Sequence, residues 1–148
     1  MSLQFVGPGG SFETRWLSFA LLADNVRHHL AGGIRSARFR ELFAVEGALG
    51  GKAVRLRADA LRDAARAAES LLGLPRRQLA VSRSTLEVLE RIRPSPGDET
   101  ILLDEAEALP LDLAGARTLG DVFGPLVRSL LEVTEGATGD SFVDVLDL

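Results

Sequence analysis

The sequence predicts an α+β fold: one compact domain over residues 1–148, with about five helices packed on a small sheet of short strands. Three observations support this prediction. Segments with apolar residues at every third or fourth position, typical of helices, are interleaved irregularly with short alternating segments, typical of strands. The chain has 148 residues, which suits one domain. It is 46% apolar and 26% charged, so it has enough hydrophobic material to fold without a disulfide.

The N-terminal elements are a short strand and a long helix. Residues 3–6 alternate well enough to form a strand, and the run Gly7, Pro8, Gly9, Gly10 that follows must turn. We expect Ser11 to cap a helix that continues to residue 30. Apolar residues recur along this segment at spacings of three or four, namely Phe12, Trp16, Phe19, Ala23, Val26 and Leu30.

This helix has apolar residues on two sides, because Leu17 and Leu21 lie almost opposite the main apolar stripe. A helix of this kind is either central to the fold or part of an oligomer contact. The second alternative predicts a homodimer, with Trp16, Leu17 and Leu21 as candidate contact residues.

Three elements are predicted in the middle of the chain. Residues 36–48 suit a short helix that buries Phe39, Leu42 and Phe43. Residues 53–57 alternate apolar with basic residues, which favours a strand with one face in water. Asp59 can cap the next helix, which ends at Gly73 and carries Leu61, Ala64, Ala68 and Leu72 on one side.

The next segment contains a short strand and a capped helix. Residues 78–82 could form the strand, and Ser84 with Glu87 resembles a capping box for a helix that Pro94 ends. Strands are also predicted at residues 100–103 and 109–113.

The C-terminal elements are a second capped helix and a closing strand. Thr118 and Asp121 form another capping-box pattern, although Pro125 indicates that the regular helix begins near that residue and runs to about residue 132. Residues 142–148 alternate imperfectly and suit a strand.

The charge is divided between two parts of the chain. Residues 1–97 carry 15 basic and 9 acidic side chains, a net charge of +6, whereas residues 98–148 carry 2 basic and 12 acidic ones, a net charge of −10. The division falls at residues 94–97, which are the one place where the domain could be subdivided. Because the acidic part also holds core-forming residues, we expect the two parts to pack together, with acidic groups of residues 104–112 and 140–147 exposed.

Several classes of protein are not indicated. The longest apolar run, residues 16–23, is too short to cross a bilayer, and the N-terminus lacks a secretory pattern. The chain has no cysteine, and its basic residues are 16 arginines and one lysine, a bias typical of GC-rich bacterial genomes. We therefore expect a bacterial, cytoplasmic protein without a membrane partner. No motif predicts a catalytic site, a cofactor or a metal, so we do not expect an enzyme.

Four acidic residues form the densest charged cluster, directly after the predicted strand 100–103. They are Asp104, Glu105, Glu107 and Asp112. Such carboxylates could be a solvated loop, a patch for a partner with a basic surface, or a site for Mg²⁺ or Ca²⁺. We take the partner-binding patch as the functional hypothesis, because the lysine and glycine patterns of the usual metal sites are missing.

Residues 78–86 resemble the turn and the start of the recognition helix of bacterial helix-turn-helix proteins. Under this alternative, Arg76, Arg77, Arg83 and Ser84 would contact DNA. Pro75 departs from the motif, since it occupies what would be the interior of the preceding helix. The isoelectric point of 5.2 also argues against nucleic acid as a partner.

The favoured functional hypothesis is a small protein that works by protein–protein binding, as regulators, adaptors and immunity-type proteins do. A DNA-binding regulator that uses residues 78–93 is the second hypothesis, and a small-molecule-binding protein is the third. The sequence does not identify the partner or the biological process.

Overall fold

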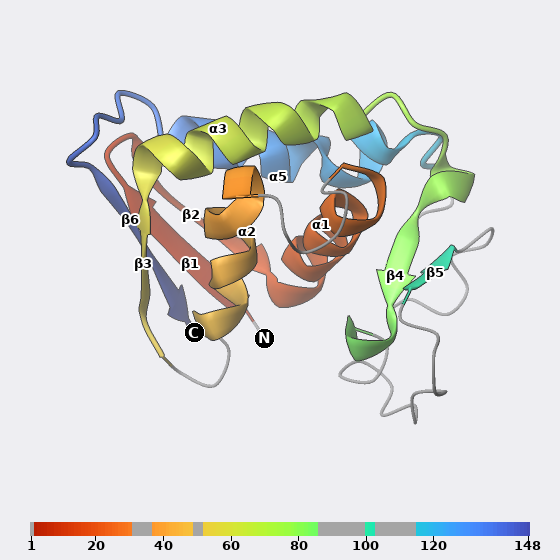
Figure 1. Cartoon of the computed structure of the whole chain (residues 1–148), viewed down its shortest axis with the longest axis horizontal. Coiled ribbons are helices and arrows are strands. Elements are labelled where there is room, and N and C mark those ends of the chain that lie inside the picture. The colour runs from red at the N-terminus through yellow and green to blue at the C-terminus, as the bar shows by residue number, and fades with distance from the viewer. Residues whose placement is uncertain (1, 31–36, 49–51, 86–99, 103–114) are drawn as a thin grey trace.

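Four antiparallel strands form the main sheet of the protein, in the order β2-β1-β6-β3. A computed structural model describes residues 2–30, 37–48, 52–85, 100–102 and 115–148 (Figure 1). The strands are β1 (Ser2–Gly7), β2 (Gly10–Arg15), β3 (Val54–Arg57) and β6 (Phe142–Asp147). The predicted strands at the two ends of the chain are thus confirmed, and they pair with each other through the register of Phe5 with Val145.

The first hairpin corrects the predicted start of the long helix. Residues 12–15 belong to β2, so Ser11 is not a helix cap, and the helix α1 (Trp16–His29) follows Arg15. Phe12 lies opposite Phe5 across the hairpin, and the two rings stack with centroids 4.7 Å apart. The spacing of Phe12 and Trp16 fits a helix, but the side chain of Phe12 contributes to the core from a strand.

The helix α1 is central to the fold. Ten of the eleven residues from Trp16 to Val26, all except Ser18, are buried in the single chain. Trp16, Leu17 and Leu21 are 7%, 4% and 0% exposed, so the candidate dimer contact lies inside the chain. A dimer contact through these three side chains would require α1 to leave the core. Whether the protein dimerises stays a prediction.

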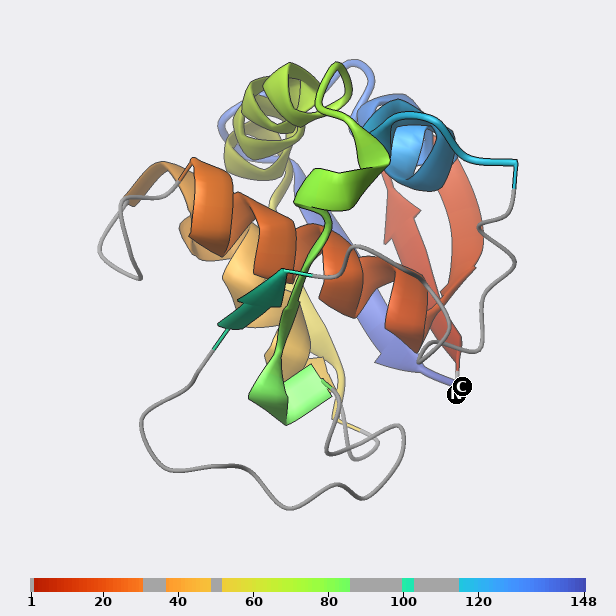
Figure 2. The same cartoon turned by 90° about the vertical axis from the view of Figure 1, so that its right-hand side faces the viewer.

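Two longer helices cover the sheet together with α1. The helices α3 (Ala58–Ala68) and α5 (Leu119–Val133) pack against each other, as Figures 1 and 2 show, and both contact strands of the main sheet. The shorter α2 (Arg40–Ala44) continues at both ends as 3-10 turns, Ala37–Phe39 and Val45–Ala48. The described helices therefore lie on one side of the sheet, and their apolar residues form one core with its inner face.

The helix α5 begins earlier than Pro125 indicated. Thr118 and Asp121 form the predicted capping box, which fixes the first turn at Leu119, and Pro125 lies inside the helix. The cap satisfies backbone amides at the start of the helix and determines its first residue. In α3, by contrast, Asp59 lies in the first turn and Arg57 is at the cap position.

A second, two-stranded sheet lies apart from the first (Figure 1). It pairs β4 (Ala80–Ser82) with β5 (Thr100–Leu102), and a 3-10 turn, Arg76–Gln78, precedes it. A helical turn begins at Arg83 directly after β4. Its cap is Ser82, whose Oγ accepts a hydrogen bond from the Thr85 amide at 3.1 Å, so the expected cap at Ser84 is wrong.

The acidic C-terminal part supplies a central strand. Strand β6 lies between β1 and β3, with Val143 and Val145 fully buried. The two differently charged parts therefore share one core, and the predicted single compact α+β domain is confirmed. The candidate subdivision at residues 94–97 and the predicted strand 109–113 lie outside the described residues.

Candidate functional site

The acidic cluster that the sequence singled out lies outside the described residues. It consists of Asp104, Glu105, Glu107 and Asp112, and its role in binding stays a prediction. The other expected acidic surface, residues 140–147, is described, and one of its carboxylates is neutralised by an arginine. Asp140 is exposed, but Asp144 forms an ion pair with Arg55 on the neighbouring strand, with Nε and Oδ1 2.9 Å apart.

The described part of the candidate motif, residues 78–85, does not have helix-turn-helix geometry. The segment that would be the turn is strand β4, and a 3-10 turn rather than an α-helix precedes it. Arg76 and Arg77 lie in that 3-10 turn, whereas Arg83 and Ser84 open the helical turn on the other side of β4. DNA binding as such is not tested by this geometry, but the motif that suggested it is absent.

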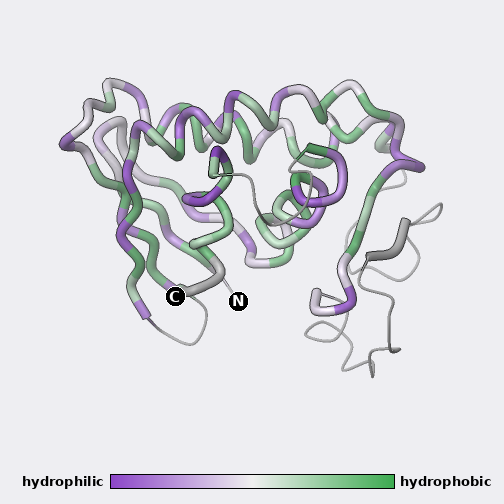
Figure 3. Tube along the Cα trace, viewed as in Figure 1, coloured by the Kyte–Doolittle hydropathy of each residue, from purple (hydrophilic) through white to green (hydrophobic). Residues whose placement is uncertain are grey.

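The outer face of the main sheet is the first candidate surface. Along β1 and β6 the inward residues are buried, while the alternate ones point outward. Three large apolar side chains of this outward set are well exposed: Val6 at 41%, Phe142 at 48% and, just after β6, Leu148 at 59%. Figure 3 shows the hydropathy along these strands. No other large apolar side chain among the described residues is as exposed.

Charged side chains border this apolar strip on both edge strands. Arg55 and Arg57 are exposed on β3, and Glu13 and Arg15 are exposed on β2. The Arg55 guanidinium is paired with Asp144 and also lies 5.4 Å from the ring centre of Phe142. The Asp144 carboxylate beside it holds the pKa of Arg55 above its ordinary value. The outer face thus carries exposed apolar side chains among charged groups of both signs, with Asp144 opposite Val6 on the neighbouring central strand.

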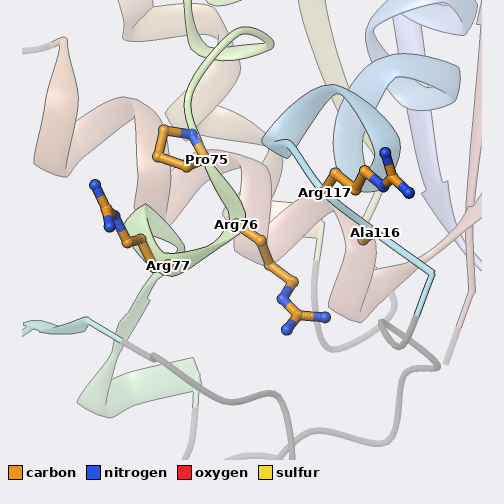
Figure 4. Close-up of a pocket in the computed structure, with 5 residues that line it drawn as sticks. All are labelled: Pro75, Arg76, Arg77, Ala116 and Arg117. Atoms are coloured by element: carbon orange, nitrogen blue, oxygen red, sulfur yellow. The ribbon is translucent and has the colours of Figure 1, made fainter.

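An arginine-lined hollow at the other end of the molecule is the second candidate. Its described lining is Pro75, Arg76, Arg77, Ala116 and Arg117, and it has a volume of about 320 Å³ (Figure 4). Two chain segments are held together there by backbone hydrogen bonds. The Arg76 amide donates to the Arg117 carbonyl at 3.0 Å, and the Leu119 amide donates to the Leu74 carbonyl at 2.8 Å.

One carboxylate lies close to this hollow but faces the backbone. Asp121 Oδ2 accepts hydrogen bonds from the amides of Arg117 at 2.8 Å and Thr118 at 3.2 Å. These bonds, chiefly the one from Arg117, hold the pKa of Asp121 below its ordinary value. Because the carboxylate is used by the cap of α5, its oxygen is directed at the backbone rather than at the arginine side chains.

Polar side chains of α1 hold strand β4, an arrangement that the sequence did not predict. Asn25 binds both backbone groups of Ala80: its Nδ2 donates to the carbonyl and its Oδ1 accepts from the amide, both at 2.9 Å. Asp24 Oδ2 accepts from the Ser82 amide at 2.9 Å and from the Thr85 hydroxyl at 2.8 Å. His29 Nε2 lies 2.8 Å from the Gln78 carbonyl oxygen.

The Asp24 carboxyl is almost completely buried, with 3% of the residue exposed. Burial raises its pKa, against the opposing effect of the hydrogen bonds from Ser82 and Thr85 and of the Arg27 charge. The sequence signal for this set was the adjacent polar pair Asp24 and Asn25 within a segment that is otherwise apolar. We therefore assign these residues a role in the fold, since their contacts are all within the chain.

Comparisons with other proteins do not add an identity. The chain matches no protein-family model, and no curated protein or solved structure is similar enough to count as a match. Within the described ranges, no group of three or more metal-binding side chains comes together. None of the described helices combines the length and hydropathy that a bilayer span needs.

Proposed function

We propose that the protein acts by binding another protein, and that the outer face of the main sheet is its contact surface. The observation that carries this proposal is the shared location of Val6, Phe142 and Leu148, the well-exposed large apolar residues of the described chain. Exposed apolar groups that share one face with charged groups of both signs are typical of surfaces that a partner covers. A regulator, an adaptor or an immunity-type protein would use such a surface.

The size of this face favours a weak contact. Four strands spaced by about 4.8 Å, three of them about 20 Å long and β3 about 13 Å long, give a flat area of roughly 300 Å². A stable complex buries about 800 Å² on each partner, so this face alone suits a transient interaction. The partner surface that fits it has apolar side chains opposite Val6 and Phe142 and carries both charge signs opposite Arg55, Arg57 and Glu13. A second copy of the chain is one such partner.

The proposal also covers the cellular setting. The chain has no cysteine, which suits a reducing compartment, and its basic residues are almost all arginine. We propose that the partner is met in the bacterial cytoplasm. The acidic cluster 104–112 remains the proposed contact for a partner with a basic surface.

Site-specific photo-crosslinking in cells tests the contact surface. A photoreactive amino acid is placed at Val6 in one variant and at Phe142 in another, and Arg66, exposed on α3, is the control position. We expect both sheet positions to link to the same protein and the control position not to do so. Equal linking from Arg66, or no linking from the sheet, contradicts the proposal.

The captured protein is then tested in purified form. Phe142→Ser should weaken its binding by about tenfold or more, because a large apolar contact is lost. Arg66→Ser should leave binding unchanged. If the linked protein is the chain itself, light scattering should show a dimer at high concentration, and Phe142→Ser should shift it toward the monomer.

A further inference from the structure

We propose that two copies of the chain pair along the free edge of strand β2, antiparallel to each other, with Thr14 of one copy opposite Thr14 of the other. The pairing joins the two main sheets into one continuous sheet. It uses the edge of the sheet rather than its outer face, so the inference goes beyond the proposed function and does not depend on it.

The two edge strands of the main sheet, β2 and β3, differ in how they are protected (Figure 1). Strand β3 has four residues, and the amide of Arg57 donates to Glu41 Oε2 on α2 at 2.9 Å. Strand β2 has six residues, without proline or lysine, and Ser11, Glu13 and Arg15 are exposed on it. Proteins that stay monomeric often keep edge strands short or cover them. Strand β3 fits this description, whereas β2 has the length and composition to accept another strand.

The backbone of β2 faces the free edge at every second residue. The Leu148 amide donates to the Ser2 carbonyl at 2.9 Å, so even-numbered residues of β1 bond toward β6 and odd-numbered ones toward β2. Odd-numbered residues of β1 lie opposite even-numbered residues of β2. The amides and carbonyls that point to the free edge are therefore those of Ser11, Glu13 and Arg15. Apart from the hairpin itself, no described residue forms a hydrogen bond with the backbone of Ser11 or Glu13.

The charges on β2 select the register of the pairing. Glu13 and Arg15 are exposed on the same face of the strand, and neither forms an ion pair with a described residue. In the register centred on Thr14, Glu13 of each copy lies opposite Arg15 of the other, so the dimer gains two pairs of opposite charges. The register centred on Glu13 places two carboxylates opposite each other, which is unfavourable. Registers centred nearer the hairpin turn leave Arg15 without an opposite charge.

The register centred on Thr14 also brings the free backbone groups together. In an antiparallel pair, two opposite residues exchange hydrogen bonds when the backbone groups of both point toward the neighbouring strand. The Arg15 amide of each copy then donates to the Glu13 carbonyl of the other. Side-chain charge and backbone pairing are thus satisfied in one symmetric arrangement.

Disulfide trapping tests the register directly, because the chain has no cysteine of its own. Thr14→Cys places two thiols at a non-hydrogen-bonded pair, where the Cα atoms lie about 4.5 Å apart, a distance that a disulfide can span. Ser11→Cys is the control on the same strand, because its two thiols are separated by about 20 Å along the paired strands. We expect mild oxidation to link Thr14→Cys into a dimer and to leave Ser11→Cys mostly monomeric. Equal linking in the two variants, or none in Thr14→Cys, would overturn the proposal.

Analytical ultracentrifugation at low salt tests the role of the charges. Glu13→Arg and Arg15→Glu each place like charges opposite one another, so each should weaken the dimer by about tenfold, while the double variant restores both pairs and should dimerise like the wild type. Phe142→Ser, on the outer face, should leave this dimer unchanged, which separates it from a contact through that face. A wild type that stays monomeric at high micromolar concentration, a double variant without recovery, or a loss caused by Phe142→Ser alone contradicts pairing through β2.

Discussion

The two sheets of this protein are held to the rest of the chain in different ways. The main sheet contacts the helices through apolar side chains such as Phe5, Leu56 and Val145, which are all buried. Strand β4 of the small sheet is bound to α1 by hydrogen bonds between its backbone and two side chains: Asn25 donates to and accepts from Ala80, and Asp24 accepts from the Ser82 amide. In effect, Asn25 takes the place that a neighbouring strand would occupy beside Ala80.

These two kinds of contact differ in how precisely they fix the position of a strand as well as in how much they stabilise the fold. Apolar contacts are not directional, so a sheet face held by them tolerates small shifts. Hydrogen bonds at 2.9 Å to both backbone groups of one residue allow a single register only. We infer that the main sheet supplies most of the folding free energy and that α1 determines the position of β4.

The largest expected effect is on the main sheet. Phe5→Ala should lower the free energy of unfolding by about 3–5 kcal/mol, because the ring is fully buried and packs on Phe12 and Phe19. Val6→Ala, on the same strand but facing outward, is the matched control and should change it by less than about 0.5 kcal/mol. Urea denaturation measures both, and equal losses would contradict the assignment of inner and outer faces.

The second effect is local to β4. Asn25→Ala should cost about 2–4 kcal/mol, since it leaves the buried amide and carbonyl of Ala80 without their partner. Hydrogen exchange should speed up at Ala80 and Ser82 well before it does at Phe5. His28→Ala, an exposed change on the same helix, serves as the control. Uniform acceleration over both sheets would mean that Asn25 supports the whole core.

A third, smaller effect concerns the contact between the first hairpin and α5. The Gly9 amide donates to the Val133 carbonyl at 3.0 Å, and a Cβ at Gly9 would lie 1.9 Å from the Glu132 carbonyl oxygen. Gly9→Ala should therefore cost about 1–3 kcal/mol. Gly124→Ala, within α5 where a Cβ meets no atom within 4 Å, should instead stabilise by about 0.5–1 kcal/mol. Thermal unfolding of the pair checks the sign of each.

The smallest expected effect on the free energy of unfolding concerns the buried carboxyl of Asp24 beside β4. Since folding raises the pKa of Asp24, this residue stabilises the protein most when protonated, below the ordinary aspartate pKa of about 3.9. That contribution is lost as the pH rises through the raised pKa. Asp24→Asn should thus stay within about 1 kcal/mol of the wild type at neutral pH. The free energy of unfolding of Asp24→Asn, relative to that of the wild type, should increase between acidic and neutral pH. A decrease over that range would show that the fold favours the ionised form of Asp24.

Local patterns predicted most of the elements. Alternation located β3 and β6, and the capping pair Thr118 and Asp121 was recognised, but Pro125 led to a predicted start of α5 later than the observed Leu119. The prediction failed at Phe12, where a residue of a strand happened to continue the spacing of a helix. The spacing of apolar residues alone cannot distinguish a helix residue from a strand residue that has the same spacing by chance. Here the packing of Phe12 comes from its hairpin partner, Phe5.

The candidate surfaces were less predictable, because they depend on contacts between distant residues. Arg76 and Arg77 were singled out as DNA contacts, but Arg117 was not, since nothing local connects it with them. The outer face of the main sheet depends on the pairing of β1 with β6, which no local pattern specifies. The acidic cluster was the opposite case: it is evident in the sequence and lies outside the described residues.

The position of β6 has a consequence for how the chain folds during synthesis. Strand β1 is made first, but both its neighbour β6 and the link from β6 to β3 await residues 142–147. Contacts of such long sequence separation form slowly. Until then one edge of β1, both edges of β3 and the inner face around Phe5 lack the neighbour that β6 supplies, and unpaired edges of this kind favour aggregation.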